Sequence, residues 1–167
     1  MDERIERLNE IAQHGNIDAF YIKIWEDVKL LEHIDELPFV DTPLHIFAYN
    51  GHVPFSIEMM KLKPSFVSKL NLDGHRPIHL ALINGCTEIV CQLLQHKADL
   101  VRVKGKKCMT PLHLHIDLFE KFLSVCLDSI IDLTTRNEAT LHIALKYDKL
   151  EAFTFLVGSL VKNRFLL

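Results

Sequence analysis

A four-residue phrase recurs along the chain at nearly constant spacing, and no other feature of the sequence constrains the fold as strongly. Its copies are Thr42-Pro-Leu-His45, Arg76-Pro-Ile-His79, Thr110-Pro-Leu-His113 and Ala139-Thr-Leu-His142. Their histidines follow one another after 34, 34 and 29 residues. Self-similarity with a period of about 33 residues indicates a repeat protein, in which each repeat contacts only its neighbours. We therefore expect stacked repeats instead of one globular core.

The residue types in this phrase predict the start of a helix. Threonine is a good N-cap, proline fits the first helical position, and the histidine ring can tie the helix start to the preceding turn. Gly51 and Gly85 stand where a left-handed residue closes that helix. An apolar stripe of helical period follows, as at Ile89-Val90 and Leu93-Leu94, so each copy predicts a pair of helices. The structural signature comprises Thr42, Pro43, His45, Pro77, His79, Thr110, Pro111, His113 and His142.

The phrase T-P-L-H-x-A at this period is typical of ankyrin repeats. It predicts an all-α ankyrin-repeat solenoid, with paired antiparallel helices and short hairpin-like loops, forming one domain over residues 1–167. The predicted parts are a divergent N-terminal cap repeat (1–40) and four repeats (41–74, 75–108, 109–137 and 138–167). The third repeat is shortened and lacks the helix-closing glycine. Because repeats are stabilised by their neighbours, we expect it to weaken the C-terminal half.

Longer phrases make the resemblance more specific. They are GNIDA (15–19), DTPLHI (41–46), LKPSF (62–66), KLNLDG (69–74), PIHLAL (77–82), DLVRVKG (99–105) and ATLHIAL (139–145). On these phrases the chain resembles the ankyrin region of plant ankyrin-repeat proteins of the BDA and accelerated-cell-death type. The resemblance implies a non-enzymatic protein–protein interaction module in plant defence or cell-death signalling. Full-length members usually add a C-terminal PGG domain with several membrane spans, which this chain is expected to lack.

The resemblance leaves one alternative function open. In it, the chain is a membrane-associated regulatory subunit that assembles with full-length PGG-domain ankyrin proteins. The plasma membrane would then be reached only through such partners or through a missing C-terminal region. Otherwise we expect a cytoplasmic monomer that binds a protein partner.

Composition and charge exclude several other classes of function. The 19 basic and 22 acidic residues give a net charge of −3, so there is no electrostatic case for nucleic-acid binding. The N-terminal segment MDERIERLNE lacks the apolar stretch of a signal peptide. Four cysteines without C-x-x-C spacing are expected to be reduced thiols of an intracellular protein.

The sequence predicts no catalytic, cofactor-binding or metal site. The nucleophile, phosphate-loop and H-E-x-x-H motifs are all missing from it. The four signature histidines should lie one repeat apart and so should not converge on one ion. His113, His115 and Cys108 come nearest to a zinc site, but no fourth ligand is evident.

Two further features have a simple structural interpretation. Arg102, Lys104, Lys106 and Lys107 form a basic run before the third copy. We interpret it as a solvated loop, with contact to an acidic partner or anionic lipid as the alternative. We interpret Trp25 and the phenylalanines as core and cap residues, because the phenylalanines fall on helical stripes.

A candidate partner-binding surface follows from the repeat register. The signature residues fix the stack, so partner choice must come from other positions on the concave face. These are the residue before each threonine position and the pair before each helix-closing glycine. The candidates are Asp41, Tyr49, Asn50, His75, Ile83, Asn84, Met109, Glu138, Lys146 and Tyr147. Tyr49, Ile83 and Tyr147 are the expected anchors, because the repeat core needs none of them.

Overall fold

The computed structural model describes residues 2–164 of the chain. Regular structure in this range consists of helices, apart from one isolated antiparallel bridge between Leu133 and Ala139. The predicted all-α class is therefore confirmed. The chain divides into two compact units, residues 1–97 and 98–167, and each is described by itself.

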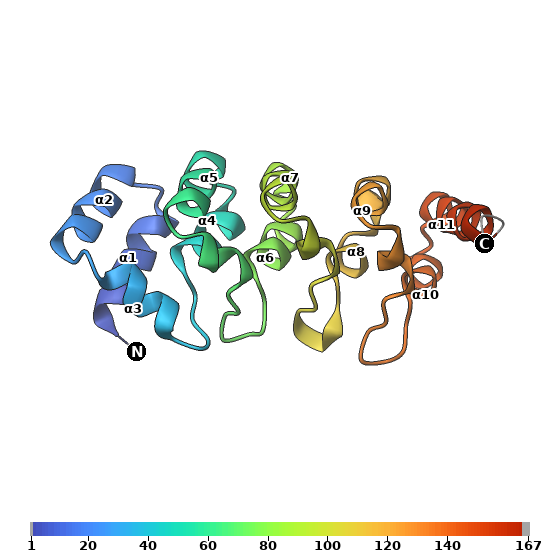
Figure 1. The fold of residues 1–167 in the computed structure, drawn as a ribbon, viewed down its shortest axis with the longest axis horizontal. Helices are drawn as coiled ribbons and strands as arrows, with labels where there is room; N and C mark the ends of the chain where they lie inside the picture. The colour runs from blue at the N-terminus through green and yellow to red at the C-terminus, as the bar shows by residue number, and fades with distance from the viewer. Residues whose placement is uncertain (1, 165–167) are drawn as a thin grey trace. The chain divides into compact units, whose positions relative to one another are not determined.

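Unit 1 (residues 1–97) is built from antiparallel helix pairs. Its helices are α1 (Glu3–Gln13), α2 (Ile17–Glu26), α3 (Leu30–Glu36), α4 (Pro43–Asn50), α5 (Val53–Leu62), η1 (Pro64–Ser68), α6 (Pro77–Ile83) and α7 (Thr87–His96). Helices α1, α4 and α6 lie side by side, and α2, α5 and α7 pair with them in that order. The loops at 37–42 and 69–76 extend away from the helices (Figure 1).

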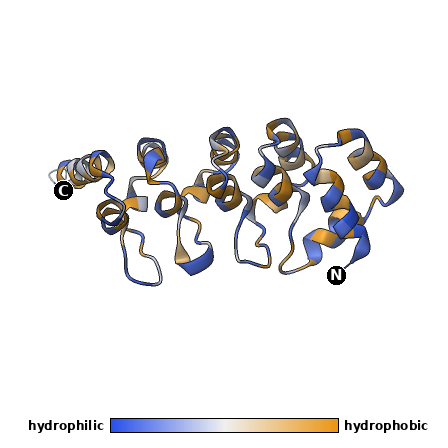
Figure 2. Cartoon of the chain, turned by 180° about the vertical axis from the view of Figure 1, so that it is seen from behind, coloured by the Kyte–Doolittle hydropathy of each residue, from blue (hydrophilic) through white to orange (hydrophobic). Residues whose placement is uncertain are grey.

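Helix α4 shows why the signature starts and ends a helix where it does. The Thr42 hydroxyl accepts a bond from the backbone N–H of His45, and Pro43 occupies the first turn. Gly51 ends the helix with φ of +76°, a left-handed conformation that glycine adopts without steric cost. Between these ends, Leu44 is fully buried, as is Ile78 at the equivalent position of α6. Figure 2 shows that the helices carry both hydrophobic and hydrophilic residues, as expected of helices with one buried and one exposed side.

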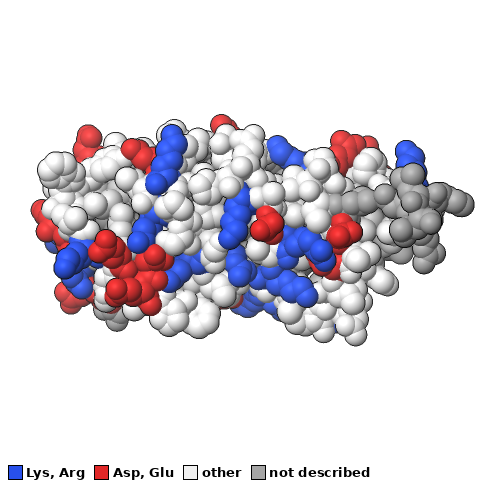
Figure 3. Space-filling model, viewed as in Figure 1, with Lys and Arg blue, Asp and Glu red and all other residues white. Residues whose placement is uncertain are grey.

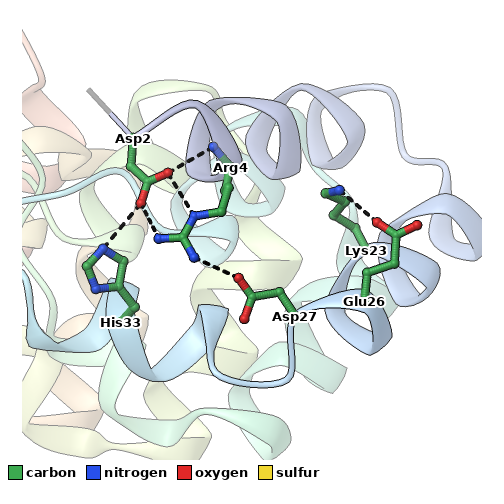
Figure 4. Close-up of polar contacts among 6 residues, drawn as sticks. All are labelled: Asp2, Arg4, Lys23, Glu26, Asp27 and His33. Atoms are coloured by element: carbon green, nitrogen blue, oxygen red, sulfur yellow. Dashed lines mark hydrogen bonds and ion pairs between the residues drawn. The ribbon is translucent and has the colours of Figure 1, made fainter.

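The N-terminal helices are joined by an exposed charged network (Figure 4). Asp2 caps α1 by accepting from the backbone N–H of Arg4, and its carboxylate also accepts from the Arg4 guanidinium at 2.7 Å. Arg4 donates in addition to Asp27 at 2.9 Å, and His33 Nε2 lies 3.3 Å from Asp2. The hydrogen bonds from Arg4 lower the pKa of Asp2 to about 2. The network thus links the start of α1 to the α2–α3 turn and to α3, a helix that the sequence did not predict.

Unit 2 (residues 98–167) has the same pairing, but its first pair, α8 (Pro111–Leu114) and α9 (Phe119–Val125), is shorter than the pairs of unit 1. The other elements of the unit are η2 (Ala98–Arg102), η3 (Lys106–Cys108), η4 (Ile116–Leu118), η5 (Leu127–Ile131), α10 (Thr140–Lys146) and α11 (Leu150–Arg164). Helix α8 has only four residues, whereas α4 has eight. It packs on α9 and α10, and the Phe119 and Phe155 rings, 4.8 Å apart, link α9 to α11.

One loop position has a left-handed backbone in three successive repeats. It holds Gly74 (φ +78°), Cys108 (φ +55°) and Asn137 (φ +57°), each two residues before the first residue of the signature phrase. Lys107 next to Cys108 is also left-handed, with φ of +58°. Glycine and asparagine tolerate this conformation, but lysine and cysteine adopt it at a cost. The 103–110 loop is therefore the most strained of the three.

The short α8 should make its own backbone easier to open. It has only four residues, and two backbone bonds extend past its ends, from Leu114 N–H to Thr110 and from His115 N–H to Pro111. We expect the amides of 112–115 to exchange with deuterium about tenfold faster than those of 46–50 in α4, because fewer consecutive helical bonds protect them. Hydrogen–deuterium exchange with residue resolution measures this difference. Equal protection of the two helices would show that the short helix is not a weak point.

Candidate functional site

His45 shows the role of a signature histidine. Its Nδ1 atom lies 3.2 Å from the backbone nitrogen of Thr42 and 2.8 Å from the Thr42 hydroxyl oxygen. Because a backbone N–H can only donate, Nδ1 is the acceptor and the proton sits on Nε2. Nε2 donates in turn to the carbonyl oxygen of His75, at 3.1 Å. The ring therefore bonds Thr42, the residue just before its helix, and in addition ties the helix to the following loop.

Burial keeps this histidine neutral. The His45 side chain is fully buried, and burial lowers its pKa to about 4. Burial also lowers the pKa of His113, whose Nδ1 lies 2.6 Å from the Thr110 hydroxyl oxygen. These rings act as neutral hydrogen-bonding groups that hold the helices and loops in register.

The remaining signature histidines make the same bond at their own helices. Nδ1 of His79 accepts from the backbone N–H of Arg76 at 3.1 Å, and Nδ1 of His142 accepts from that of Ala139 at 3.0 Å. Each histidine thus serves a different helix. No group of three or more histidine, cysteine or carboxylate residues able to hold a metal occurs within residues 2–164.

In unit 1, the candidate anchors lie at the ends of two neighbouring helices. Tyr49 is 47% exposed and Ile83 is 53% exposed, and each stands four residues after the signature histidine of its helix. The side-chain amide of Asn84 donates to the carbonyl oxygen of Tyr49, which links the end of α6 to the end of α4. The structure therefore brings Tyr49, Ile83 and Asn84 together on one surface.

The other candidates in unit 1 are already engaged within it. The Asp41 carboxylate accepts from the side chain of Asn71 at 2.8 Å. Asn50 donates to the carbonyl oxygen of Ile46 in its own helix, and the carbonyl of the half-buried His75 accepts from His45. These polar groups shape the surface around Tyr49 and Ile83.

In unit 2, all four candidates line one pocket of about 140 Å³. They are Met109, Glu138, Lys146 and Tyr147. The Lys146 ammonium lies 3.1 Å from the Glu138 carboxylate and 5.9 Å from the centre of the Tyr147 ring. The hydrogen bond from Lys146 lowers the pKa of Glu138. Tyr147 remains 63% exposed beside this ion pair.

Two cations in this pocket were not among the candidates. Lys107 and Arg136 line it from two successive loops, where the backbone N–H of Thr135 donates to the carbonyl oxygen of Lys107 at 3.0 Å. The sequence does contain a signal for Arg136. Lys107 and Arg136 are 29 residues apart, and the signature histidines that follow them, His113 and His142, have the same spacing.

The basic run is not one solvated loop. Arg102 lies in η2 and forms a bidentate ion pair with Asp132. Its Nε atom lies 3.0 Å from one carboxylate oxygen, and a terminal guanidinium nitrogen lies 2.7 Å from the other. These bonds raise the pKa of Arg102 further above its ordinary value. Arg102 therefore fastens two successive loops together, and the interpretation of a solvated run was wrong for this residue.

Trp25 also differs from its expected role. It is 82% exposed, and with Tyr21 and Ile22 it lines an apolar surface on α2. Phe20 fills the interior instead, with its ring 5.2 Å from that of Phe47. Trp25 follows Phe20 by five residues, which turns it about 140° around the helix and away from that contact. The prediction that Trp25 fills the core or cap was wrong.

No helix in the part of the chain covered by the structure combines the length and apolar character needed to cross a membrane.

Comparison with known proteins gives the following relatives. The family of ankyrin repeats (3 copies) matches residues 8–104. The chain is 39% identical over 64 residues to "Ankyrin repeat-containing protein BDA1" of Arabidopsis thaliana, which covers 38% of this chain and 15% of that protein. It is 29% identical over 122 residues to "Transient receptor potential cation channel subfamily A member 1 homolog" of Caenorhabditis elegans, covering 71% of this chain and 10% of that protein.

The chain therefore corresponds to only a small part of either relative. The family match spans more than half of the chain. Paired helices that begin at the signature phrase lie inside the matched range, and further pairs of the same kind follow it. The chain belongs to the ankyrin-repeat family.

Proposed function

We propose that this chain is a non-catalytic protein-interaction module. Ankyrin repeats build extended surfaces for binding other proteins, and selection of the partner falls to side chains that the stack does not need. The observation that carries the proposal is the contrast within α4 and α6. His45 and His79 are fully buried, whereas Tyr49 and Ile83, four residues later, present large apolar groups to solvent. Aromatic and apolar anchors of this kind often contribute most of the binding energy.

We propose that the ten candidate residues contact the partner, six from unit 1 and four from unit 2, with Tyr49 and Ile83 as anchors in unit 1 and Tyr147 as the anchor in unit 2. The repeat boundaries that we propose are a cap repeat (1–40) followed by the repeats 41–74, 75–108, 109–137 and 138–167, and all ten candidates lie in these four repeats. The setting we propose is the cytoplasm, which is supported by the four cysteines, none of which forms a disulfide within the described residues. The resemblance to plant BDA-type proteins, supported by the partial match to the Arabidopsis protein, favours defence or cell-death signalling.

Proximity labelling in the native tissue identifies the partner, and its binding can then be measured with purified proteins. Tyr49→Ala combined with Ile83→Ala should weaken binding by more than about 2 kcal/mol, or about thirtyfold, because two exposed anchors are lost. The melting temperature should hardly change. The matched control is Glu88→Ala with Gln95→Ala, two exposed positions on α7.

The proposal fails if the Tyr49/Ile83 variant binds the partner as tightly as the wild type does. Recovery of a membrane-spanning PGG-domain relative as the main partner would instead favour the regulatory-subunit alternative. Co-purification of the chain with membranes would agree with that outcome.

A further inference from the structure

A basic cleft in unit 2 is lined by two loops, at residues 107–109 and 134–138, and by the end of α10. We define the basic cleft by Lys107, Arg136 and Lys146, which share the 140 Å³ pocket with Met109 and Tyr147. The single carboxylate that lines this pocket is Glu138. Three cations against one carboxylate leave an excess of positive charge, although the chain as a whole carries −3. Figure 3 shows lysine and arginine side chains gathered on one face around the η3 loop, with acidic side chains beside them.

Two other carboxylates of unit 2 pair with cations outside the cleft. Asp132 is occupied by the bidentate pair with Arg102, and Asp117 pairs with Lys149 at 3.0 Å. Glu138 is held by Lys146. Within the described residues, the Lys107 ammonium and the Arg136 guanidinium have no hydrogen-bonded carboxylate partner. They are therefore the two cations of the cleft that remain available to an external anion.

Hydrogen bonds hold in place the backbone of the two loops that carry these cations. The bond from Thr135 N–H to the Lys107 carbonyl joins the loops, and the buried Thr134 hydroxyl accepts from the backbone N–H groups of Arg136 and Glu138 at 3.2 and 3.3 Å. Lys107 keeps its costly left-handed backbone in this setting. Preorganised charges lose less conformational entropy on binding than charges on a free loop.

The cleft continues into a second, largely apolar-walled pocket. Met109, Ile143 and Tyr147 line both, and the second pocket, of about 420 Å³, adds His115 and Ile116. The Nδ1 atom of His115 is buried and has no hydrogen-bond partner among the residues described. A buried ring nitrogen without a partner favours a ligand that supplies one, such as a peptide backbone.

Asp117 and Lys149, which pair with each other, also line the second pocket, as does His113, whose buried Nε2 atom has no hydrogen-bond partner among the residues described. The joined pockets thus offer cations followed by apolar side chains and two unpartnered ring nitrogens.

We propose that the basic cleft binds an acidic segment of the partner protein. Side-chain carboxylates of that segment pair with Lys107 and Arg136, and a neighbouring apolar residue enters the second pocket beside Met109 and Tyr147. The inference rests on the proposed interaction function and specifies the chemistry of the partner. Positive charge joined to an apolar pocket favours a peptide over a bare anion, because each half of the cleft then has an occupant.

The test uses the full chain and a short fluorescent peptide that alternates pairs of glutamate with leucine. At low salt we expect saturable binding, followed by fluorescence anisotropy. The double variant Lys107→Gln with Arg136→Gln should bind about tenfold or more weakly, because two charge-assisted contacts are lost. Raising the salt to physiological strength should weaken wild-type binding and affect the variant less.

Two controls separate the cleft from net charge and from folding. Lys61→Gln with Lys162→Gln removes the same charge from exposed positions outside the cleft and should bind the peptide as the wild type does. The reversed variant Lys107→Glu with Arg136→Glu should prefer a matched peptide with lysine in place of glutamate. Circular dichroism should show unchanged helicity in every variant.

The inference is overturned if the glutamate peptide does not bind, or if the Lys107/Arg136 variant binds it with wild-type affinity. It is also overturned if phosphatidylserine vesicles bind the wild type through these two residues while the peptide does not. The proposed interaction function is judged separately, by the Tyr49/Ile83 variant and its partner. If only the peptide fails to bind, the cleft proposal is wrong and the proposed interaction function is unaffected. If only the Tyr49/Ile83 variant binds its partner normally, the interaction function is wrong and the peptide result is unaffected.

Discussion

Phe47→Ala should lower the free energy of unfolding by about 4 kcal/mol. Phe47 is 1% exposed, and its ring centre lies 5.2 Å from that of Phe20, 5.5 Å from that of Phe55 and 6.2 Å from that of His52. The substitution restores the alanine that the ankyrin phrase T-P-L-H-x-A has at this position. It should nevertheless destabilise the chain, because Phe20 of the N-terminal helices packs against the phenylalanine ring and a cavity would replace it.

Urea unfolding followed by circular dichroism measures this loss. The matched control is His115→Ala, which makes the same change to the family residue at the equivalent position of the third copy. His115 is half-buried with an unpartnered Nδ1, so its removal should cost less than about 1 kcal/mol. A Phe47→Ala variant as stable as the wild type would show that Phe20 does not depend on Phe47 for its packing.

Acidification should destabilise the fold through His45. Its pKa is about 4 in the folded chain, against 6.5 as its ordinary value. Between these values the unfolded chain binds more protons than the folded chain, so stability falls as the pH is lowered from about 6.5 to about 4. A difference of about 2.5 pKa units corresponds to about 3 kcal/mol in the free energy of unfolding, and the fold has lost this amount once the pH is below 4. Protonation at Nδ1 would also replace the bond from Thr42 N–H with repulsion.

The free energy of unfolding should be measured from pH 7.5 to pH 5, a range in which most carboxylates remain charged. His45→Gln is the informative variant, since it does not titrate. It should be less stable than the wild type at pH 7.5 and should show a much flatter pH profile. Equal slopes for the two proteins would assign the acid sensitivity to other groups.

The helix pairs could be predicted because their signals are local. Threonine or proline at a helix start and glycine at +76° after α4 act within a few residues, so the phrase around Thr42 predicts α4 without knowledge of the rest. Helix α3 was missed because it is only seven residues long and has no side-chain cap. The shortened α8 follows from the missing residues in the third copy.

Contacts between repeats were harder to predict. Arg102 and Asp132 are 30 residues apart, and no local pattern in either segment indicates that they pair. The exposure of Trp25 depends on which face of α2 meets Phe47, and the apolar run from Ile17 to Ile24 does not specify that face. Lys107 and Arg136 meet because their loops are adjacent, which only the repeat register, extended to the loops, would have indicated.

Site-specific photocrosslinking tests most directly whether the helix ends and loops form the partner-binding surface. A photoreactive amino acid would replace Tyr49 or Tyr147 in turn, with Gln95 on α7 and Glu120 on α9 as exposed control positions. We expect efficient crosslinks to the partner from positions 49 and 147 and little or none from positions 95 and 120. Crosslinks mainly from 95 and 120 would place the partner on the second helices and contradict the proposed surface.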